Sequence, residues 1–281
     1  MPLRIPQDEP RTLEQLREHY LIEKQLADRL RASSREQRRH LYTDLYDDLY
    51  ERVPLHPQLR RKADSKAQAT AVSEKMRLLR PFLRPGSTFL EAGPGDCALS
   101  LEAAKFVKKV YAVDVSERIT EGFTAPSNFE LIISDGCSIP VPDKTVNVAY
   151  SNQLIEHLHP DDALEQLRNI YDALTSGGVY ICVTPNRLFG PHDISKYFDE
   201  VAKGFHLKEY TITELAKMFR AVGFAKVQAL IVVGGVYRLV PVFPLLWIEA
   251  VLAGLPRSFN KPMLHRAPFR TLLEIRLVAT K

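Results

Sequence analysis

Apolar residues recur at helical intervals near the start of the chain, which predicts helices over residues 10–52. The recurring positions are Leu13, Leu16, Tyr20, Leu26 and Leu30. Ser34 followed by Gln37 is typical of a capping box, so we expect a second helix to begin there. That helix carries a column of three leucines beside a column of three tyrosines: Leu41, Leu45 and Leu49, and Tyr42, Tyr46 and Tyr50. We expect this stripe to pack against the rest of the protein; a roof over a ligand site is the alternative.

Beyond a proline-rich break at residues 53–57, short apolar runs alternate with helical patterns. Expected strands cover residues 88–92, 109–113, 128–134, 146–150, 178–183, 224–233 and 272–279. Expected helices cover residues 65–79, 97–106, 161–174 and 211–222, with a short one from Ser116. This alternation predicts an α/β protein with a doubly wound, mostly parallel sheet. We therefore expect an N-terminal helical cap over residues 1–80 and one main domain over residues 81–281.

Composition narrows the class of protein. The chain has 281 residues and 45% hydrophobic content, enough for a large core. The net charge of +4 arises within the first 80 residues, where both signs are interleaved, which is typical of a solvated helix face and argues against nucleic-acid binding. Cys97, Cys137 and Cys182 are few, odd in number and widely spaced, so we expect a reducing, cytoplasmic compartment and no disulfide framework. The N-terminus lacks the apolar stretch of a signal peptide, and no segment is predicted to span a membrane.

The segment from Phe89 to Ser100 carries the most specific chemical signal. It combines a buried strand, a Gly-Pro-Gly turn and the start of a helix. Gly93 and Gly95 lack a Cβ, so a ligand can lie against bare backbone, and the helix directs free N–H groups at the same space. Glu91, two residues before the first glycine, would repel a pyrophosphate and attract a cationic ligand.

This segment resembles motif I of the class I S-adenosylmethionine-dependent methyltransferases, in which an acid precedes Gly-x-Gly. The resemblance covers roughly residues 81–235 and the last strand, and it implies a Rossmann-like sheet of seven strands, the last antiparallel. Asp114 ends the second strand, where a carboxylate can accept hydrogen bonds from two ribose hydroxyls. Asp135 and Gly136 follow the third strand, where the family binds the adenine ring. The implied cofactor is S-adenosylmethionine.

The fourth strand leads into Ser-Asn-Gln-Leu-Ile-Glu-His, similar to the segment of small-molecule methyltransferases that lies beside the methionine part of the cofactor. The resemblance assigns Asn152 and Gln153 to cofactor binding, and places Glu156 and His157 toward the acceptor. His157 is the candidate general base, because imidazole titrates near neutral pH. His206 matches a histidine that is frequent in the family.

A second resemblance raises the question of a metal ion. Ubiquinone-pathway O-methyltransferases and small-RNA 3′-end methyltransferases show Glu-x-x-Glu-His after the fourth strand, and the RNA enzymes bind a divalent metal there. In this chain Gln153 stands at the first glutamate position, before Glu156 and His157. Because an amide is a weaker ligand than a carboxylate for a hard dication, we expect no metal.

Two long segments concern the acceptor. Residues 188–210 are rich in aromatic residues and histidine, so we expect a lid over the acceptor pocket. Residues 236–268 form an apolar insertion that would add to the core, line a pocket for an apolar acceptor or contact a membrane surface.

The sequence thus predicts methyl transfer to an oxygen of a small, apolar acceptor. Three alternatives stay open at this point. A nicotinamide-dependent oxidoreductase would share Gly93, Gly95 and Asp114, and Ala98 completes the dinucleotide fingerprint. An RNA methyltransferase would use the basic N-terminal helices, and a non-catalytic protein would bind S-adenosylmethionine without transfer. The oligomeric state has no sequence signal.

Overall fold

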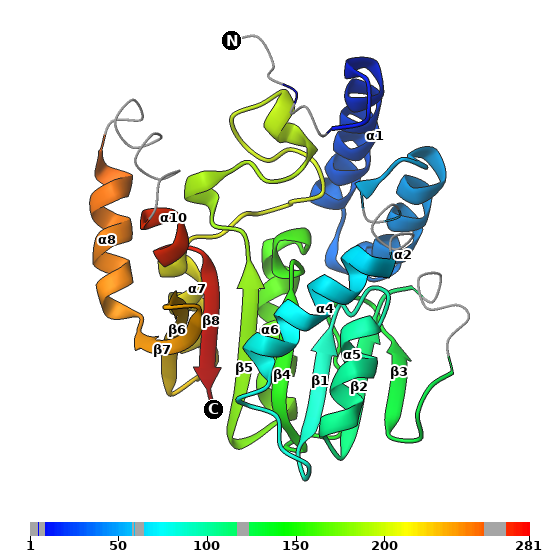
Figure 1. Ribbon diagram of the computed structural model, residues 1–281. Coiled ribbons are helices and arrows are strands. Elements are labelled where there is room, and N and C mark those ends of the chain that lie inside the picture. The colour runs from blue at the N-terminus through cyan, green and yellow to red at the C-terminus, as the bar shows by residue number, and fades with distance from the viewer. Residues whose placement is uncertain (1–4, 6–8, 58, 60–64, 117–123, 256–267) are drawn as a thin grey trace.

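A central eight-stranded sheet organises the protein (Figure 1). The computed structural model describes residues 5, 9–57, 59, 65–116, 124–255 and 268–281. The short helix expected from Ser116 lies outside these residues. The strands are β1 (Thr88–Ala92), β2 (Lys109–Asp114), β3 (Phe129–Ile133), β4 (Val146–Asn152), β5 (Leu174–Thr184), β6 (Lys226–Val233), β7 (Val236–Pro241) and β8 (Ile275–Thr280).

The strand order is β3-β2-β1-β4-β5-β8-β6-β7. Neighbours from β3 to β5 are parallel, and β8 runs antiparallel to both β5 and β6. This confirms the predicted doubly wound, mostly parallel sheet with an antiparallel last strand. The expected count of seven is one too few, because β7 forms a hairpin with β6 and extends the sheet edge. The additional strand comes from the first residues of the 236–268 insertion.

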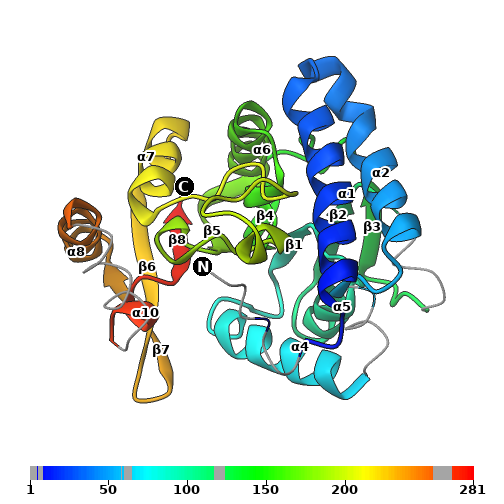
Figure 2. The ribbon, with the colours of Figure 1, turned by 90° about the horizontal axis from the view of Figure 1, so that it is seen from above.

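Helices cover both faces of the sheet, as the view from above shows (Figure 2). Helices α4 and α5 lie on one face, and α6 and α7 lie on the other. Side chains alternate along β1 accordingly: Phe89 packs with the α4 and α5 side, and Leu90 packs with the α6 and α7 side. The helices are α1 (Leu13–Ala32), α2 (Arg35–Arg52), α4 (Ser65–Leu79), α5 (Ala98–Ala103), α6 (Pro160–Ala173), α7 (Ile212–Val222), α8 (Phe243–Gly254) and α10 (Phe269–Leu272).

The N-terminal helices begin where the capping signals predict. Thr12 caps α1 and Ser34 caps α2, each accepting a hydrogen bond from the backbone of the residue three positions on. Thr211 and Glu214 form the same reciprocal box at the start of α7. Helices α1 and α2 lie above the carboxyl ends of the parallel strands (Figure 1). Buried side chains of both, such as Leu26 and Leu45, belong to the same hydrophobic core as those of α6 and α7, whereas Leu16 and Tyr20 of α1 form a separate cluster.

The segment expected as a lid is tied to α1. It contains single 3-10 turns at Arg187–Phe189 and Ile194–Tyr197. Arg31 donates hydrogen bonds to the carbonyls of Lys203 and Gly204, each at 3.0 Å. The Phe205 N–H donates to Glu23 at 2.9 Å. The N-terminal helices therefore position this segment over the sheet edge where the parallel strands end.

Candidate functional site

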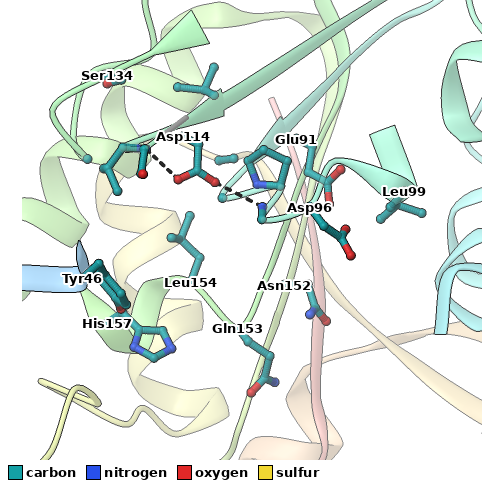
Figure 3. A pocket seen from close by; sticks show the side chains of 18 of the residues that line it. Tyr46, Glu91, Asp96, Leu99, Asp114, Ser134, Asn152, Gln153, Leu154 and His157 are labelled. Atoms are coloured by element: carbon teal, nitrogen blue, oxygen red, sulfur yellow. Dashed lines mark hydrogen bonds between the residues drawn. The ribbon is translucent and has the colours of Figure 1, made fainter. Parts of the chain in front are cut away.

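A cavity of about 530 Å³ lies at the carboxyl ends of β1, β2 and β4 (Figure 3). This is the edge at which doubly wound sheets bind their ligands. Its walls come from the turn after β1, the ends of β2 and β4, helix α2 and helix α4. The residues that line it include seven that the sequence assigns to the cofactor, and His157 lines it as well. The seven are Glu91, Gly93, Gly95, Asp114, Gly136, Asn152 and Gln153.

The turn between β1 and α5 presents bare backbone to this cavity. Gly93 and Gly95 have φ values of +68° and +57°, the left-handed region that favours glycine. A Cβ on Gly93 would lie 2.9 Å from the Leu154 side chain, whereas a Cβ on Gly95 would meet only open space. Gly93 is therefore required for packing against the segment after β4, and Gly95 keeps the cavity floor open to a ligand.

Glu91 is a buried carboxylate at the end of β1. Its side chain accepts a 2.5 Å hydrogen bond from the Ser100 hydroxyl on α5. Burial raises the pKa of Glu91 to about 7, although the Ser100 hydrogen bond and the charge of Lys75 oppose this shift. A carboxyl group in this environment ionises more readily when a cation is beside it. The position thus favours a positively charged ligand, as the sequence predicts.

Asp114 ends β2 and faces the glycine turn (Figure 3). Its two carboxylate oxygens accept hydrogen bonds from the backbone N–H groups of Gly95 (3.1 Å) and Val115 (2.7 Å). Burial raises its pKa, and the backbone hydrogen bonds only partly offset that effect. Each oxygen keeps a further lone pair. Asp114 can therefore accept hydrogen bonds from the two hydroxyl groups of a ribose, which is the role that the sequence predicts for it.

Asp135 lies behind the cavity wall. One of its oxygens accepts hydrogen bonds from the N–H groups of Cys137 (2.9 Å) and Ser138 (2.7 Å). Burial disfavours the charged form, but the Ser138 and Cys137 hydrogen bonds outweigh it and lower the pKa of Asp135. Ser134, Gly136 and Ser138 line the cavity in its place. The carboxylate therefore fixes the turn, and its neighbours, not Asp135 itself, face the cavity.

Asn152 ends β4, Gln153 follows it, and both line the cavity (Figure 3). The Gln153 N–H donates a hydrogen bond to the Val183 carbonyl at 2.8 Å, and Gln153 has a φ of +54°. Non-glycine residues in that region are uncommon and cluster at functional sites. The backbone after β4 is thus bent so that both amide side chains reach the cavity.

Helix α2 provides the roof. Tyr42, Tyr46 and Tyr50 all line the cavity. Tyr42 is also buried in the hydrophobic core. The tyrosines of α2 therefore both pack against the protein and cover the cavity, so the two interpretations of this stripe hold together. Tyr46 stacks on Phe205 with ring centroids 4.9 Å apart, and its ring lies 6.1 Å from that of His157. The roof therefore ends in an aromatic wall beside the candidate base.

Helix α4 closes the remaining side and was not assigned to the site from sequence. Its lining residues include Gln68 and Lys75. Gln68 donates a 2.7 Å hydrogen bond to Asp96 in the glycine turn. The amphipathic pattern of residues 65–79 predicts a helix but not which structure its polar residues face, so no local signal would have identified them.

His157, Glu156 and His206 come together at the end of the cavity nearest the segment 188–210. His157 Nδ1 lies 3.1 Å from the Phe205 carbonyl oxygen. Because a carbonyl only accepts, Nδ1 carries the proton and Nε2 of the neutral ring is an acceptor. The rings of His157 and His206 meet edge to face, with centroids 4.8 Å apart.

The pKa of His157 differs from the value near neutral pH that the sequence led us to expect. Burial, followed by the charge of His206, lowers the pKa of His157 to about 3, so it does not titrate near neutral pH. Burial would lower the pKa of His206 too, but its hydrogen bond to Glu209 (2.7 Å) and the charge of Glu156 outweigh burial and raise it. Glu156 is fully buried, which raises its pKa, and accepts a 2.8 Å hydrogen bond from Thr184.

The same three side chains are the candidate metal ligands at this end of the cavity. Potential ligand atoms of Glu156, His157 and His206 lie within 4.8 Å of one another. Gln153, which stands at the first glutamate position of the metal-binding relatives, belongs to the cavity lining. A protonated His206 has no lone pair to offer a metal. The raised pKa of His206 thus favours an ion pair between His206 and Glu209 over a metal centre.

The cavity combines an exposed glycine backbone, two carboxylates and an acceptor-side histidine on a doubly wound sheet. These features define a class I S-adenosylmethionine-dependent methyltransferase. A family model described as a methyltransferase domain matches residues 62–229. The chain belongs to this family, and S-adenosylmethionine is its cofactor.

Curated relatives agree with the family. The chain is 28% identical over 141 residues to a "probable S-adenosylmethionine-dependent methyltransferase" of Mycolicibacterium smegmatis, covering 50% of this chain and 52% of the relative. A protein of the same description from Mycobacterium tuberculosis is 29% identical over 140 residues, covering 49% and 48%. The chain thus spans about half the length of the curated relatives it matches.

Solved structures share the fold. A SAM-dependent methyltransferase from Archaeoglobus fulgidus aligns with a TM-score of 0.50 and 18% identity, covering 75% of this chain and 94% of that one. Haemonchus contortus phosphoethanolamine N-methyltransferase 1, solved with phosphoethanolamine and S-adenosylhomocysteine, aligns with a TM-score of 0.51 and 18% identity, covering 67% and 41%. At such identities the likeness concerns the fold alone.

Proposed function

We propose that this protein transfers a methyl group from S-adenosylmethionine to a hydroxyl oxygen of a small-molecule acceptor. The observation that carries the proposal is the orientation of His157 beside the cofactor cavity. Its Nδ1 proton is held by the Phe205 carbonyl, and burial lowers its pKa to about 3, so Nε2 has an unprotonated lone pair at neutral pH. The aromatic wall of Tyr46 and Phe205 provides an apolar neighbourhood for the acceptor.

Different cavity residues bind different parts of the cofactor. The turn at Gly93 and Gly95 offers bare backbone to the nucleoside, and Asp114 accepts from its ribose hydroxyls. Glu91 supplies negative charge for the cationic methionine part, beside the amide groups of Asn152 and Gln153. The surface formed by Ser134, Gly136 and Ser138, held in shape by Asp135, meets the adenine.

The cofactor supplies an electrophilic methyl carbon on a positively charged sulfur. His157 Nε2 removes the proton of the acceptor hydroxyl as the new oxygen–carbon bond forms and the carbon–sulfur bond breaks, its electron pair remaining on sulfur. His157 is a weak base, and the charge of Glu23 together with the hydrogen bond to the Phe205 carbonyl favours the imidazolium that forms. Alignment of the two reactants in a closed site accounts for much of the acceleration, roughly 7–11 kcal/mol.

A small acceptor fits better than RNA because the acceptor end is enclosed. Helix α1 holds the segment 188–210 through Arg31 and Glu23, and α2 covers the cavity with its tyrosines. A polynucleotide needs an open, positively charged groove. Here the charges that act on His157 are of both signs, those of Glu23 on one side and of His206 and His56 on the other, so they form no positive track. Salt-sensitive RNA binding would instead support the RNA alternative.

A cytoplasmic location is part of the proposal. Cys97, Cys137 and Cys182 are all buried and unpaired, which suits a reducing compartment. Among the described residues, no helix is both long and apolar enough to cross a bilayer.

The test is a metabolite screen with methyl-labelled S-adenosylmethionine, followed by kinetics on the best acceptor. We expect His157→Ala to lower kcat about 100-fold or more while cofactor affinity stays unchanged, because general-base catalysis contributes on the order of 10²–10⁴. His40→Ala, which removes an exposed histidine on α2, is the matched control and should keep full activity. Full turnover of His157→Ala would refute the base role. Tight binding of reduced nicotinamide instead of S-adenosylmethionine would refute the function itself.

A further inference from the structure

Helix α8 presents an apolar face to solvent at the edge of the molecule opposite β3 (Figures 1 and 2). Phe243, Trp247 and Val251 recur every fourth residue and are 63%, 58% and 60% exposed. The Phe243 and Trp247 rings contact each other edge to face, with centroids 6.2 Å apart. The other exposed residues of this helix are Pro244, Ala250, Ala253 and Gly254. A surface helix normally turns polar residues outward, so this face is built to be covered.

The opposite face of α8 is fixed to the protein. Leu245 and Leu252 are buried in the core. Glu249, also buried, accepts hydrogen bonds from the N–H groups of Ile212 (2.9 Å) and Thr213 (2.7 Å) at the start of α7. A carboxylate at a helix N-terminus satisfies otherwise unpaired donors. This anchor prevents the helix from rotating its apolar face inward.

The stretch of sequence that follows α8 is basic. From Ala250 to Leu273 there is no acidic residue. The same interval contains Arg257, Lys261, Arg266 and Arg270. Arg238 on β7 and Arg270 on α10 are exposed. An apolar helix face with aromatic residues next to a run of cations is typical of an interfacial membrane-binding segment.

We infer that α8 docks the protein on an anionic lipid surface. Phe243, Trp247 and Val251 enter the boundary between headgroups and acyl chains, and the exposed Arg238 and Arg270 provide positive charge for the lipid phosphates. Charge complementarity favours this occupant over a second copy of the chain, because the sequence from Ala250 to Leu273 has four Lys and Arg residues and no acid. A symmetric pairing of α8 with itself would bring two segments of the same charge together.

Trp247 makes the inference directly measurable, because it is the one tryptophan of the chain. The purified full chain is titrated with two kinds of phosphatidylcholine vesicles. One contains roughly one phosphatidylglycerol in every three lipids, and the other contains none. We expect a blue shift of the tryptophan emission and co-sedimentation with the anionic vesicles, both reduced by high salt. Phe243→Ser/Val251→Ser keeps the reporter and should weaken binding about tenfold or more.

Val201→Ser is the matched control, since Val201 is 54% exposed on the segment 188–210, and it should bind as the wild type does. Circular dichroism and the tryptophan spectrum without vesicles establish that the double variant is folded. Three results would overturn the inference: absence of vesicle binding, equal binding to neutral vesicles, or a concentration-dependent blue shift without lipid accompanied by dimer formation in sedimentation. The last result would assign the face to a second copy.

Discussion

Glu91 is a residue that lowers the free energy of unfolding while it favours binding of a cationic ligand. Its carboxyl group is buried, and its pKa rises from an ordinary 4.5 to about 7. An acid whose pKa is raised by folding stabilises the protein below the unfolded pKa and loses that contribution as the pH rises through the folded pKa. Above pH 7 the protein therefore bears the cost of a buried charge, which a cationic ligand relieves.

Affinity for S-adenosylmethionine should consequently depend on pH. We expect the dissociation constant, measured by calorimetry, to improve about tenfold between pH 5.5 and pH 7, as the ionised fraction of Glu91 rises. Glu91→Gln keeps the shape and should show weak binding with little pH dependence. The same variant should gain about 2–3 kcal/mol in the free energy of unfolding at pH 8. A wild-type affinity that is constant over this range would contradict the role of Glu91.

Glu156 and His206 also bear on whether the protein binds a metal ion. The Glu209 hydrogen bond and the charge of Glu156 raise the pKa of His206 against the effect of burial, which favours an ion pair with Glu209 over a metal ligand. The pKa of Glu209 falls to about 2, because its hydrogen bonds with His192 and His206 outweigh burial. We expect activity to be unchanged after exhaustive chelation, and elemental analysis to find no stoichiometric metal. Loss of turnover that Zn²⁺ or Mn²⁺ restores would show instead that His206 is neutral and a ligand.

At the scale of elements, the turn between β1 and α5 connects the sheet to the ligand. Its two glycines adopt similar left-handed conformations but have different surroundings. Gly93 packs against Leu154 from the segment after β4, whereas Gly95 faces the cavity. The first glycine thus serves the contact between two elements, and the second serves access to the backbone.

Alanine substitutions should separate these two roles. Both variants bear a left-handed backbone cost of roughly 1–2 kcal/mol. Gly93→Ala adds a 2.9 Å approach to Leu154, so urea unfolding should find it the less stable of the two. Gly95→Ala should keep most of its stability yet lose cofactor affinity, because the new methyl group projects into the cavity. Equal stability of the two variants would contradict the packing argument.

At the scale of the molecule, the N-terminal helices are held to the sheet by a buried ion pair. Arg38 on α2 donates to both oxygens of Asp162 on α6, at 2.6 and 2.8 Å, and both side chains are buried. Tyr42 also donates to Asp162, at 2.8 Å, and accepts from the His159 N–H at 2.9 Å. This network orients the tyrosine roof over the cofactor cavity.

Breaking the pair should affect stability and cofactor binding together. Arg38→Met leaves Asp162 buried without its cation, and we expect a loss of about 3–5 kcal/mol in chemical denaturation. S-adenosylmethionine affinity should fall as well, because α2 carries the roof. Arg35→Met removes an exposed arginine one turn earlier that pairs with Glu165, and should change little. A variant of Arg38 with wild-type stability would show that the cap is held by apolar packing alone.

Much of this protein is encoded locally. The hydrophobic periodicity, the Ser34 and Thr211 capping boxes and the glycine turn predict the helices, the sheet and the cofactor end of the site, because each depends on neighbours within a few residues. The eighth strand was missed because Val236–Pro241 pairs only once the β6 hairpin forms. Local patterns also placed Asp135 at the right turn but gave no means to see that its carboxylate is already occupied.

The sequence by itself therefore determined the sheet, its glycine turn and the cationic cofactor that turn accepts, since these follow from spacing and residue chemistry. Only the tertiary structure decided that the tyrosines of α2 roof the cavity, that burial lowers the pKa of His157, that Glu209 and Glu156 raise the pKa of His206 against the effect of its burial, and that α8 turns an apolar face outward. These properties depend on distances between segments far apart in the chain, such as the contact of Glu23 with Phe205, 182 residues away, and burial is set by the whole fold.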